Sequence, residues 1–300
     1  IMLIGMMVVS ASAASYNNLT DKDEIVNKDA VSMLVSLGII EGKPDGSYGP
    51  TENVDRAQMA KMLSVIMNKG VDNSALYQSV NSGLVDVNTN WAKGHINYCY
   101  TTGIIAGRGN GKFDPSATVT ALEAAKMLLV AVGYDPKIEG FEGADWAINV
   151  SVRADEQGIF EGFTKDLSAP LNRDDAALLI YNALDVEMIQ SYTTNNYPIV
   201  YSDHRTILSD KYGVIKVEGV VTANEWAILD DDTDTALQEG KTRIYNPDGI
   251  LSTTGNTAVA QDSSANVKTQ VFNVSTPVDM LGKAVTMYVK KTTILADSTV

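Results

Sequence analysis

Several residue types that commonly build catalytic or metal sites are scarce in this 300-residue chain, which has one cysteine and two histidines. A disulfide framework needs a pair of cysteines, so none can form within the chain. The histidines, His95 and His204, share no metal-ligand spacing, and no Walker, Gly-x-Ser-x-Gly or Cys/His constellation occurs. The sequence therefore predicts no catalytic residues, no metal site and no cofactor, and the single cysteine, Cys99, is interpreted as a small core residue.

Long apolar runs are also rare. Residues 1–9 form such a run, but it is too short to span a bilayer, so no transmembrane segment is expected. Small residues follow it, with Ala11-Ser12-Ala13 as an Ala-x-Ala cleavage site. We interpret residues 1–14 as the remnant of a secretory signal peptide from a longer precursor, with the mature chain beginning near Ala14 or Ser15. A buried N-terminal strand or helix is the alternative.

Positive charge is in short supply as well. The chain has 23 Lys and Arg against 37 Asp and Glu, a formal net charge of -14. Nucleic acid and anionic membrane surfaces repel such a chain, so neither is an expected partner. An anionic ligand could bind only at a local cluster of basic residues.

Internal repetition is the strongest pattern that is present. A Gly-Ile-[Ile/Phe]-x-Gly word occurs three times, at residues 38–42, 103–107 and 158–162. A turn loop with Asp-Gly or Asn-Gly follows the first two copies, and an aromatic residue in each loop, Tyr48 or Phe113, is expected to pack the loop down. The third loop, residues 165–170, is shorter.

Each word lies between two predicted helices. The downstream helix begins with a capping box or a near relative of one, formed by Asp55 with Gln58, Thr120 with Glu123 and Asn172 with Asp175. The upstream helix begins at Trp91 in the second copy and at Trp146 in the third, whereas the first copy has Val26 there. Units of this size cannot bury their apolar faces alone, so the three must pack together.

These boundaries divide the chain into repeats at 21–70, 84–135 and 141–190. A polar linker is predicted at 191–198, and alternating β-branched residues predict a β-rich region at 199–300, folded as a sandwich or small barrel. The last residues still resemble a strand and carry no terminal signal, so this region is expected to be incomplete. The predicted fold class is thus α + β with several domains.

The repeats resemble the S-layer homology domain, which has a Trp-Ala helix start, a Gly-Ile-Ile-x-Gly turn, an Asp-Gly-x-Phe-x-Pro loop and a Thr-Arg-Ala-Glu helix start. The resemblance covers about residues 21 to 190. It implies a pseudo-threefold helical bundle whose grooves hold secondary cell-wall polysaccharide, typically with a pyruvylated terminal sugar. The arginine of the last motif maps to Arg56 and Arg173, while the second repeat has Ala121 there, which puts the second repeat's site in doubt.

The residues themselves leave alternatives open. Arg56 and Arg173 stand at helix N-termini, where a cation costs about 0.3–1 kcal/mol, so an anionic ligand would explain them better than helix stability does. Pairing with a nearby acid explains them equally well. Lys43 and Arg108 either line the same grooves or are solvated loop charges. Trp91 and Trp146 could stack on a sugar, although sealing a helix pair is the favoured interpretation.

Two functions fit this organisation. The first is a secreted structural protein anchored in the cell wall or S-layer, with the polysaccharide as its partner and copies of itself in a surface array as a further candidate partner. The second is a wall-anchored enzyme, such as a glycan hydrolase, with its catalytic domain beyond residue 300. The run Asp230–Asp234 is similar to a calcium loop, but Thr235 and Lys241 replace the required Gly and Glu, so we interpret it as a solvated turn.

Overall fold

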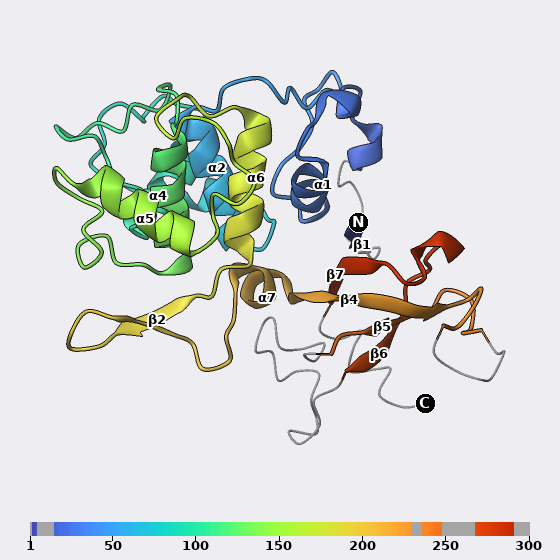
Figure 1. The fold of residues 1–300 in the computed structure, drawn as a ribbon. Helices are drawn as coiled ribbons and strands as arrows, with labels where there is room; N and C mark the ends of the chain where they lie inside the picture. Colours follow the sequence, from blue (N-terminus) through green and yellow to red (C-terminus); the bar gives the residue numbers. More distant parts are fainter. Residues whose placement is uncertain (1, 5–14, 230–235, 248–267, 291–300) are drawn as a thin grey trace. The chain divides into compact units, whose positions relative to one another are not determined.

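The computed structural model describes residues 2–4, 15–229, 236–247 and 268–290, which form two compact units (Figure 1). The helical unit spans residues 9–200 and contains the three repeated segments. The sheet unit spans residues 1–8 and 201–300 and contains the region predicted to be β-rich. Within the described ranges, no helix is long and apolar enough to cross a membrane.

Each repeated segment forms two helices, as its pattern predicts. In chain order these are α1 (Lys28–Ser36), α2 (Arg56–Met67), α3 (Lys93–Thr101), α4 (Ala121–Val132), α5 (Trp146–Glu156) and α6 (Arg173–Leu184). The first helix of each segment ends two residues before the first glycine of the Gly-Ile-[Ile/Phe]-x-Gly motif, and Gly38, Gly103 and Gly158 all adopt a positive φ of 69° to 80°. This left-handed conformation stops a helix at little cost only when the residue is glycine.

The second helix of each segment begins at its predicted cap. Asp55 with Gln58 and Thr120 with Glu123 form complete capping boxes. In the third segment the Asn172 side chain accepts the Asp175 backbone N–H, but the Asp175 carboxylate pairs with Lys165. Short 3₁₀ turns at Tyr16–Asn18, Lys22–Glu24 and Ser74–Tyr77 lie between the helices.

The first helix of each segment packs against the second helix of the preceding segment, an arrangement called the helix exchange below. α3 of the second segment packs against α2 of the first, α5 of the third packs against α4 of the second, and α1 of the first packs against α6 of the third. The second helices also contact one another, α2 with α4 and α4 with α6, and they lie side by side in Figure 1. Each segment therefore completes its hydrophobic core with a helix from its neighbour, and the exchange closes from the third segment back to the first.

Three backbone hydrogen bonds close the same cycle just before the second helices. The Val54 N–H donates to the Leu171 carbonyl (2.8 Å), Leu171 donates to Val119 (2.8 Å), and Val119 donates to Val54 (2.9 Å). All three residues are buried. Each segment thus supplies one donor and one acceptor, and no segment can complete its own pair.

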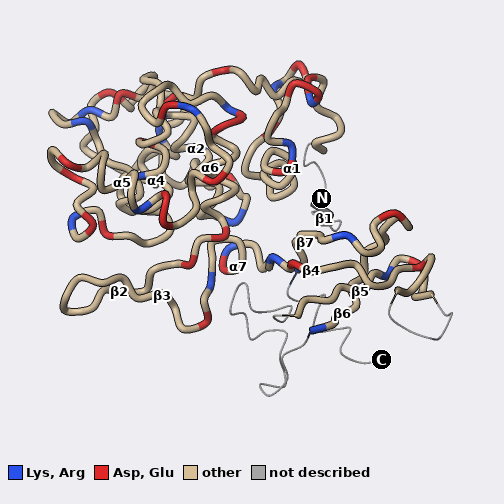
Figure 2. The backbone as a smooth tube through the Cα atoms, viewed as in Figure 1, with Lys and Arg blue, Asp and Glu red and all other residues tan. Residues whose placement is uncertain are grey.

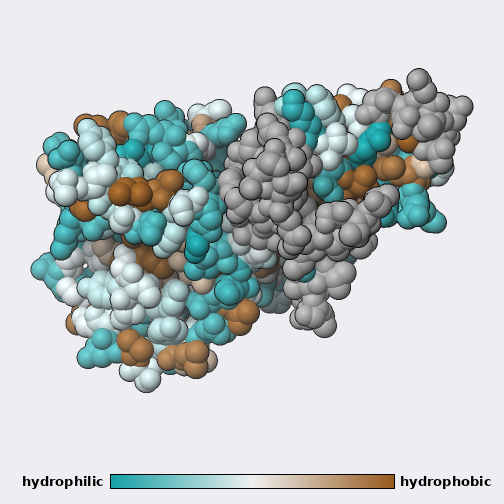
Figure 3. Space-filling model, turned by 90° about the horizontal axis from the view of Figure 1, so that it is seen from below, coloured by the Kyte–Doolittle hydropathy of each residue, from teal (hydrophilic) through white to brown (hydrophobic). Residues whose placement is uncertain are grey.

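The surface of the helical unit is mixed in character. Acidic and basic residues alternate in short stretches along its loops (Figure 2). On the face shown in Figure 3, its hydrophobic residues form small patches among hydrophilic ones. A mixed surface of this kind is ordinary for a solvent-exposed unit and marks no binding face by itself, so candidate binding sites are sought in the surface pockets.

Parts of the polar run 191–198, which the sequence predicts to be a linker, form strands. Strands β2 (Ile189–Tyr192) and β3 (Pro198–Val200) pair antiparallel and turn within this polar run. The Tyr192 hydroxyl donates to the Glu139 carboxylate (3.0 Å) and accepts the Asp135 N–H (2.9 Å), which fastens the hairpin to the helical unit. The run is polar because it forms an exposed hairpin.

The sheet unit contains β1 (Met2–Ile4), α7 (Ile207–Tyr212), β4 (Val214–Asn224), β5 (Thr242–Tyr245), β6 (Thr269–Phe272), a 3₁₀ turn at Val278–Met280 and β7 (Ala284–Lys290). The strands form one sheet in the order β1-β7-β4-β5-β6, antiparallel except for β1 beside β7. Its buried cluster includes Val217, Ile244, Phe272 and Met287. Among the described residues these strands form one sheet, and the predicted sandwich or barrel stays a prediction.

Parts of two predictions lie outside the described residues. These are residue 1 and residues 5–14 of the predicted signal peptide, and residues 291–300 of the predicted terminal strand. Residues 2–4 form β1, which is the strand alternative for this segment. Removal of the segment in the mature protein stays a prediction.

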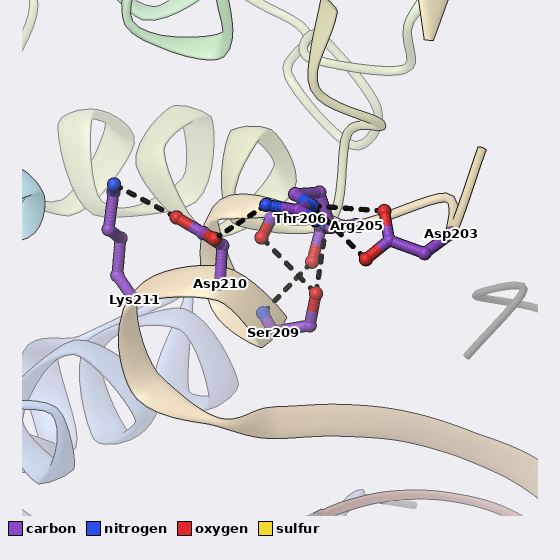
Figure 4. A network of polar contacts seen from close by, with 6 residues as sticks. All are labelled: Asp203, Arg205, Thr206, Ser209, Asp210 and Lys211. Carbon is purple, nitrogen blue, oxygen red and sulfur yellow. Dashed lines mark hydrogen bonds and ion pairs between the residues drawn. The ribbon is translucent and has the colours of Figure 1, made fainter. Parts of the chain in front are cut away.

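A polar network surrounds the start of α7 (Figure 4). Arg205 pairs with Asp203 (2.9 Å) and Asp210 (3.4 Å), and Asp210 also pairs with Lys211 (2.9 Å). Thr206 and Ser209 form the capping box of α7. Opposite charges face each other throughout this network, so it stabilises the start of the helix.

One buried titratable group connects α2 with α3. His95 is 4% exposed, its Nδ1 lies 2.6 Å from Ser64 Oγ, and its Nε2 lies 3.6 Å from the Asp72 carboxylate. Burial lowers the pKa of His95 from its ordinary 6.5, Lys61 lowers it further, and Asp72 opposes the shift. The folded chain therefore favours neutral His95.

This shift predicts a pH-dependent stability. As the pH falls below about 6.5, the unfolded chain takes up a proton that folded His95 resists, so the free energy of unfolding should fall between pH 7 and pH 5. The His95→Gln variant should lose this part of the slope, and the control His204→Gln should keep it. Urea unfolding at several pH values measures both, and equal slopes in His95→Gln and wild type would contradict the assignment.

Candidate functional site

Two surface pockets in the helical unit are built from matching positions of the repeat. Groove 1, defined here by Gly42, Lys43, Lys61, Trp91 and Arg173, has a volume of about 220 Å³. Groove 2, defined by Gly107, Arg108, Lys126, Trp146 and Arg56, has a volume of about 480 Å³. Gly42, Lys43, Lys61 and Trp91 occupy the same repeat positions as Gly107, Arg108, Lys126 and Trp146.

All three segments contribute to each groove. In groove 2 the glycine turn and α4 belong to the second segment, Trp146 begins the third, and Arg56 comes from the first. In groove 1 the turn and α2 belong to the first segment, Trp91 to the second and Arg173 to the third. The helix exchange creates this arrangement, because it places the tryptophan of one segment beside the second helix of the preceding one.

Arg56 is both a wall of groove 2 and a joint between segments. Its Nε donates to the Phe113 carbonyl (2.8 Å), its Nη2 donates to the Ala106 carbonyl (2.9 Å), and its guanidinium lies 4.3 Å from the centre of the Phe113 ring. The residue is 4% exposed. Burial, with a smaller effect of Arg108, lowers its pKa to about 10, so it stays charged at neutral pH.

Arg173 repeats this arrangement with more exposure. Its Nε donates to the Tyr48 carbonyl (2.8 Å), and its guanidinium lies 4.7 Å from the centre of the Tyr48 ring. The Tyr48 hydroxyl in turn donates to the Arg173 carbonyl (2.8 Å). Each arginine thus spans to the aromatic loop of the next segment in the cycle, a role that sequence spacing does not reveal.

The aromatic loops are fixed by carboxylates at matching positions. Asp86 accepts the backbone N–H groups of Phe113 (2.9 Å) and Asp114 (2.8 Å), and Asp21 does the same for Tyr48 and Gly49. Tyr48 and Phe113 are buried, which confirms that they pack the loops down. The arginines therefore stack on rings that are held in place.

Sequence reasoning missed two groove residues, Lys61 and Lys126. They occupy the same turn of α2 and α4, and each lines its groove. Lys126 Nζ lies 5.6 Å from the centre of the Trp146 ring, and burial together with Arg56 lowers the pKa of Lys126 although Glu142 opposes the shift. Because Arg56 disfavours the charged form of Lys126 in this pocket, an anionic ligand would relieve the repulsion. The matching positions of Lys61 and Lys126 in the repeat were the available signal.

The other predicted site residues also lie in the grooves. Lys43 pairs with Glu52, and Arg108 pairs with Glu123 (2.7 Å), so both have acidic partners while lining a pocket. Trp91 is 58% exposed, which contradicts its interpretation as a seal of a helix pair. Trp146 is half-buried beneath Lys126. Each groove therefore offers an aromatic face beside cations.

Three groups of residues that could suggest a catalytic or metal site do not form one among the described residues. Ser64, His95 and Asp72 lie in the order of a nucleophilic triad, but Ser64 is 4% exposed and contacts Nδ1, so a substrate could not reach it. Cys99 is buried and its pKa is raised by burial, which confirms a core role. The described part of the chain holds no cluster of three or more potential metal ligands among its His, Cys, Asp and Glu residues. The acidic run 230–234 lies outside the described residues.

The geometry of Arg56 predicts a large structural effect. Arg56→Ala would leave two carbonyl groups without their donors and a hole beside Phe113, so it should lower the free energy of unfolding by about 2–4 kcal/mol. Arg56→Lys should not restore it, since one ammonium cannot reproduce the planar fork. Arg108→Ala, at an exposed ion pair, should change stability by less than about 1 kcal/mol. Urea unfolding measures these changes. An Arg56→Ala variant as stable as wild type would contradict the role of Arg56 in joining the first segment to the second.

Comparisons with known proteins agree with this geometry. The S-layer homology domain family matches residues 18–60 and 85–125, which cover most of the first two segments. A cell surface protein of Thermoanaerobacter kivui is 29% identical over 253 residues, which is 82% of this chain and 30% of that protein. An S-layer protein of Bacillus licheniformis is 34% identical over 113 residues, covering 38% of this chain and 12% of that protein.

An enzyme is among the relatives too. The exoglucanase XynX of Acetivibrio thermocellus is 27% identical over 192 residues, which is 59% of this chain and 17% of that protein. The chain thus spans less than a third of the length of these relatives. Together with the repeated helical segments, these matches show S-layer homology domains at residues 18–60 and 85–125 and a likeness to surface-layer and cell surface proteins, which supports a secreted, cell-wall-associated protein.

Proposed function

We propose that the helical unit anchors the chain non-covalently to the cell wall by binding an anionic polysaccharide in grooves 1 and 2. One observation carries the proposal. In a chain with a net charge of -14, two pockets of the same design each gather three cations beside an aromatic face. Aromatic rings bind the apolar face of a sugar, and cations bind its carboxylate substituent.

The proposed ligand group is a carboxylate, such as that of a pyruvylated sugar. Arg56 and Arg173 use donors on carbonyl groups of the neighbouring loops, so they fix the pocket wall and supply positive charge. Lys61 and Lys126 lie farther along the helices. Lys61 pairs with Glu41 (3.8 Å) and Lys126 Nζ donates to the Phe141 carbonyl (2.5 Å), but an ammonium group has three N–H donors, so each lysine keeps donors for a ligand. We therefore assign the direct contact mainly to the lysines and the sugar platform to Trp91 and Trp146.

The finer family features belong to the same proposal. The third segment is proposed to be a further S-layer homology domain, because it repeats the glycine word, the cap and the helix exchange. The cycle of hydrogen bonds among Val54, Val119 and Leu171 supports a pseudo-threefold bundle. Copies of the chain in a surface array are a proposed partner as well.

A wall-anchored enzyme is the second candidate. The match to an exoglucanase over 59% of this chain favours it, since that relative combines a similar segment with an enzyme name. Both candidates use the same anchor, and they differ in what the rest of the protein does. The sequence of the full-length protein distinguishes them.

The lysines provide the cleanest test of binding. A charge-assisted hydrogen bond contributes about 1.5–3 kcal/mol, so each of Lys61→Ala and Lys126→Ala should weaken its own groove about ten- to a hundred-fold. The double variant should fail to sediment with purified cell walls, while its free energy of unfolding in urea should fall only by the loss of the hydrogen bond from Lys126 to the Phe141 carbonyl, about 1–2 kcal/mol. The control Lys28→Ala plus Lys137→Ala removes the same charge from exposed positions away from the grooves and should bind normally.

Two outcomes would contradict the proposal. A double groove variant that sediments like wild type would show that the grooves do not hold the wall. Equal loss of binding in the control would show that only net charge matters. Cell walls stripped of their anionic polysaccharide should bind neither the wild-type protein nor the control variant.

A further inference from the structure

The three junctions of the cycle are not equivalent. At the third junction, α6 of the third segment packs against α1 of the first. Four positions of the repeat that carry the cations and the tryptophan in grooves 1 and 2 carry other residues at this junction. Leu178 replaces the helix lysine, Phe163 the turn cation, Val26 the tryptophan and Ala121 the arginine. Every cation and the aromatic face of the groove design are thus missing at this junction.

The direction in which each arginine reaches shows which junction lacks an arginine because of Ala121. Because each arginine reaches the aromatic loop of the next segment, Arg56 belongs to groove 2 and Arg173 to groove 1. The N-terminus of α4 likewise meets the loop of the third segment, where the Leu122 N–H donates to the Leu167 carbonyl (3.1 Å). The alanine therefore weakens the third junction. The expectation that it weakens the site of the second repeat is corrected by this geometry.

An internal carboxylate occupies the third junction. Asp174 is 5% exposed, and its carboxylate accepts the backbone N–H groups of Val26 (3.3 Å) and Asn27 (3.2 Å) and the Asn27 side-chain amide (3.1 Å). It therefore fastens the start of α1 to α6. The corresponding residues of α2 and α4 are Ala57 and Leu122, so this joint exists only here.

The charge at the third junction is also reversed. Asp175 is buried beside Asp174, and its one ion-pair partner among the described contacts is Lys165. Glu161 and Asp175 match Glu41 of groove 1 and Glu123 of groove 2, so the third junction differs from the grooves in Asp174 and in its missing cations. An incoming carboxylate would thus meet the additional acid Asp174 and none of the three cations that line each groove.

We propose that the chain has two binding sites for an anionic sugar, grooves 1 and 2, and that the third junction is a structural joint that excludes this ligand. The inference rests on the proposed function and specifies its stoichiometry. Two sites on one rigid unit give bivalent attachment to a polymer that carries many such sugars. Loss of one groove should therefore weaken binding to intact walls more than binding of a single sugar.

Tryptophan reporters test the inference directly. The chain has three tryptophans, of which Trp91 and Trp146 lie in the grooves and Trp226 lies in the sheet unit. Val26→Trp adds a fourth at the third junction, where the wild-type side chain is 81% exposed. Indole N–H signals of the ¹⁵N-labelled full chain are followed while the methyl glycoside of a pyruvylated N-acetylhexosamine is added.

The signals of Trp91 and Trp146 should shift and saturate, while those of Trp226 and the introduced tryptophan stay in place. Calorimetry on the unchanged chain should give two sugars per chain, and Lys61→Ala or Lys126→Ala should reduce this to one. A shift of the introduced tryptophan together with the other two, or three sugars per chain, would overturn the two-site inference and leave the anchoring function intact. If neither Trp91 nor Trp146 responds, the proposed function is wrong, and the inference is wrong with it.

Discussion

The helical unit depends on a closed cycle of backbone hydrogen bonds among Val54, Val119 and Leu171. These residues are buried, so an unpaired N–H or carbonyl at any of them would carry a desolvation cost of about 1–3 kcal/mol. Because no segment can satisfy its own pair, the bonds favour an assembly of all three segments. The helix exchange follows the same cycle, since α1 returns to α6. One constraint therefore fixes the order of the segments and the places where their surfaces meet.

The grooves are a consequence of that cycle. Each is formed where a glycine turn, the helix after it, a tryptophan of the next segment and an arginine of the preceding one converge. The arginines show how structure and binding share a residue, because the same guanidinium holds the neighbouring loop and lends its charge to the pocket. Substitution of an arginine therefore affects both folding and binding. Substitution of Lys61, whose partner is the exposed Glu41, affects binding with the least effect on folding, and Lys126 lies between these cases because it also donates to the Phe141 carbonyl.

Local patterns in the sequence predicted the helices, their caps and the buried aromatic residues Tyr48 and Phe113, because these depend on neighbours close in the chain. The two lysines were equally visible as a repeat position, but their importance appears only once Trp91 and Trp146 lie beside them. Which groove an arginine serves could not be read from the sequence, since it depends on contacts between segments. The hairpin around Tyr192 was missed for a similar reason: its polar residues are typical of a linker, and the Glu139 contact that holds it is distant in sequence.

Native-state hydrogen exchange of the amides of Val54, Val119 and Leu171 tests the cycle most directly. If the cycle closes the helical unit, all three protons should exchange only through its largest opening, with free energies that agree with one another and with the free energy of unfolding. Exchange of one of the three at a far lower free energy would mean that the cycle opens at that junction. The account of grooves assembled from three segments would then be wrong.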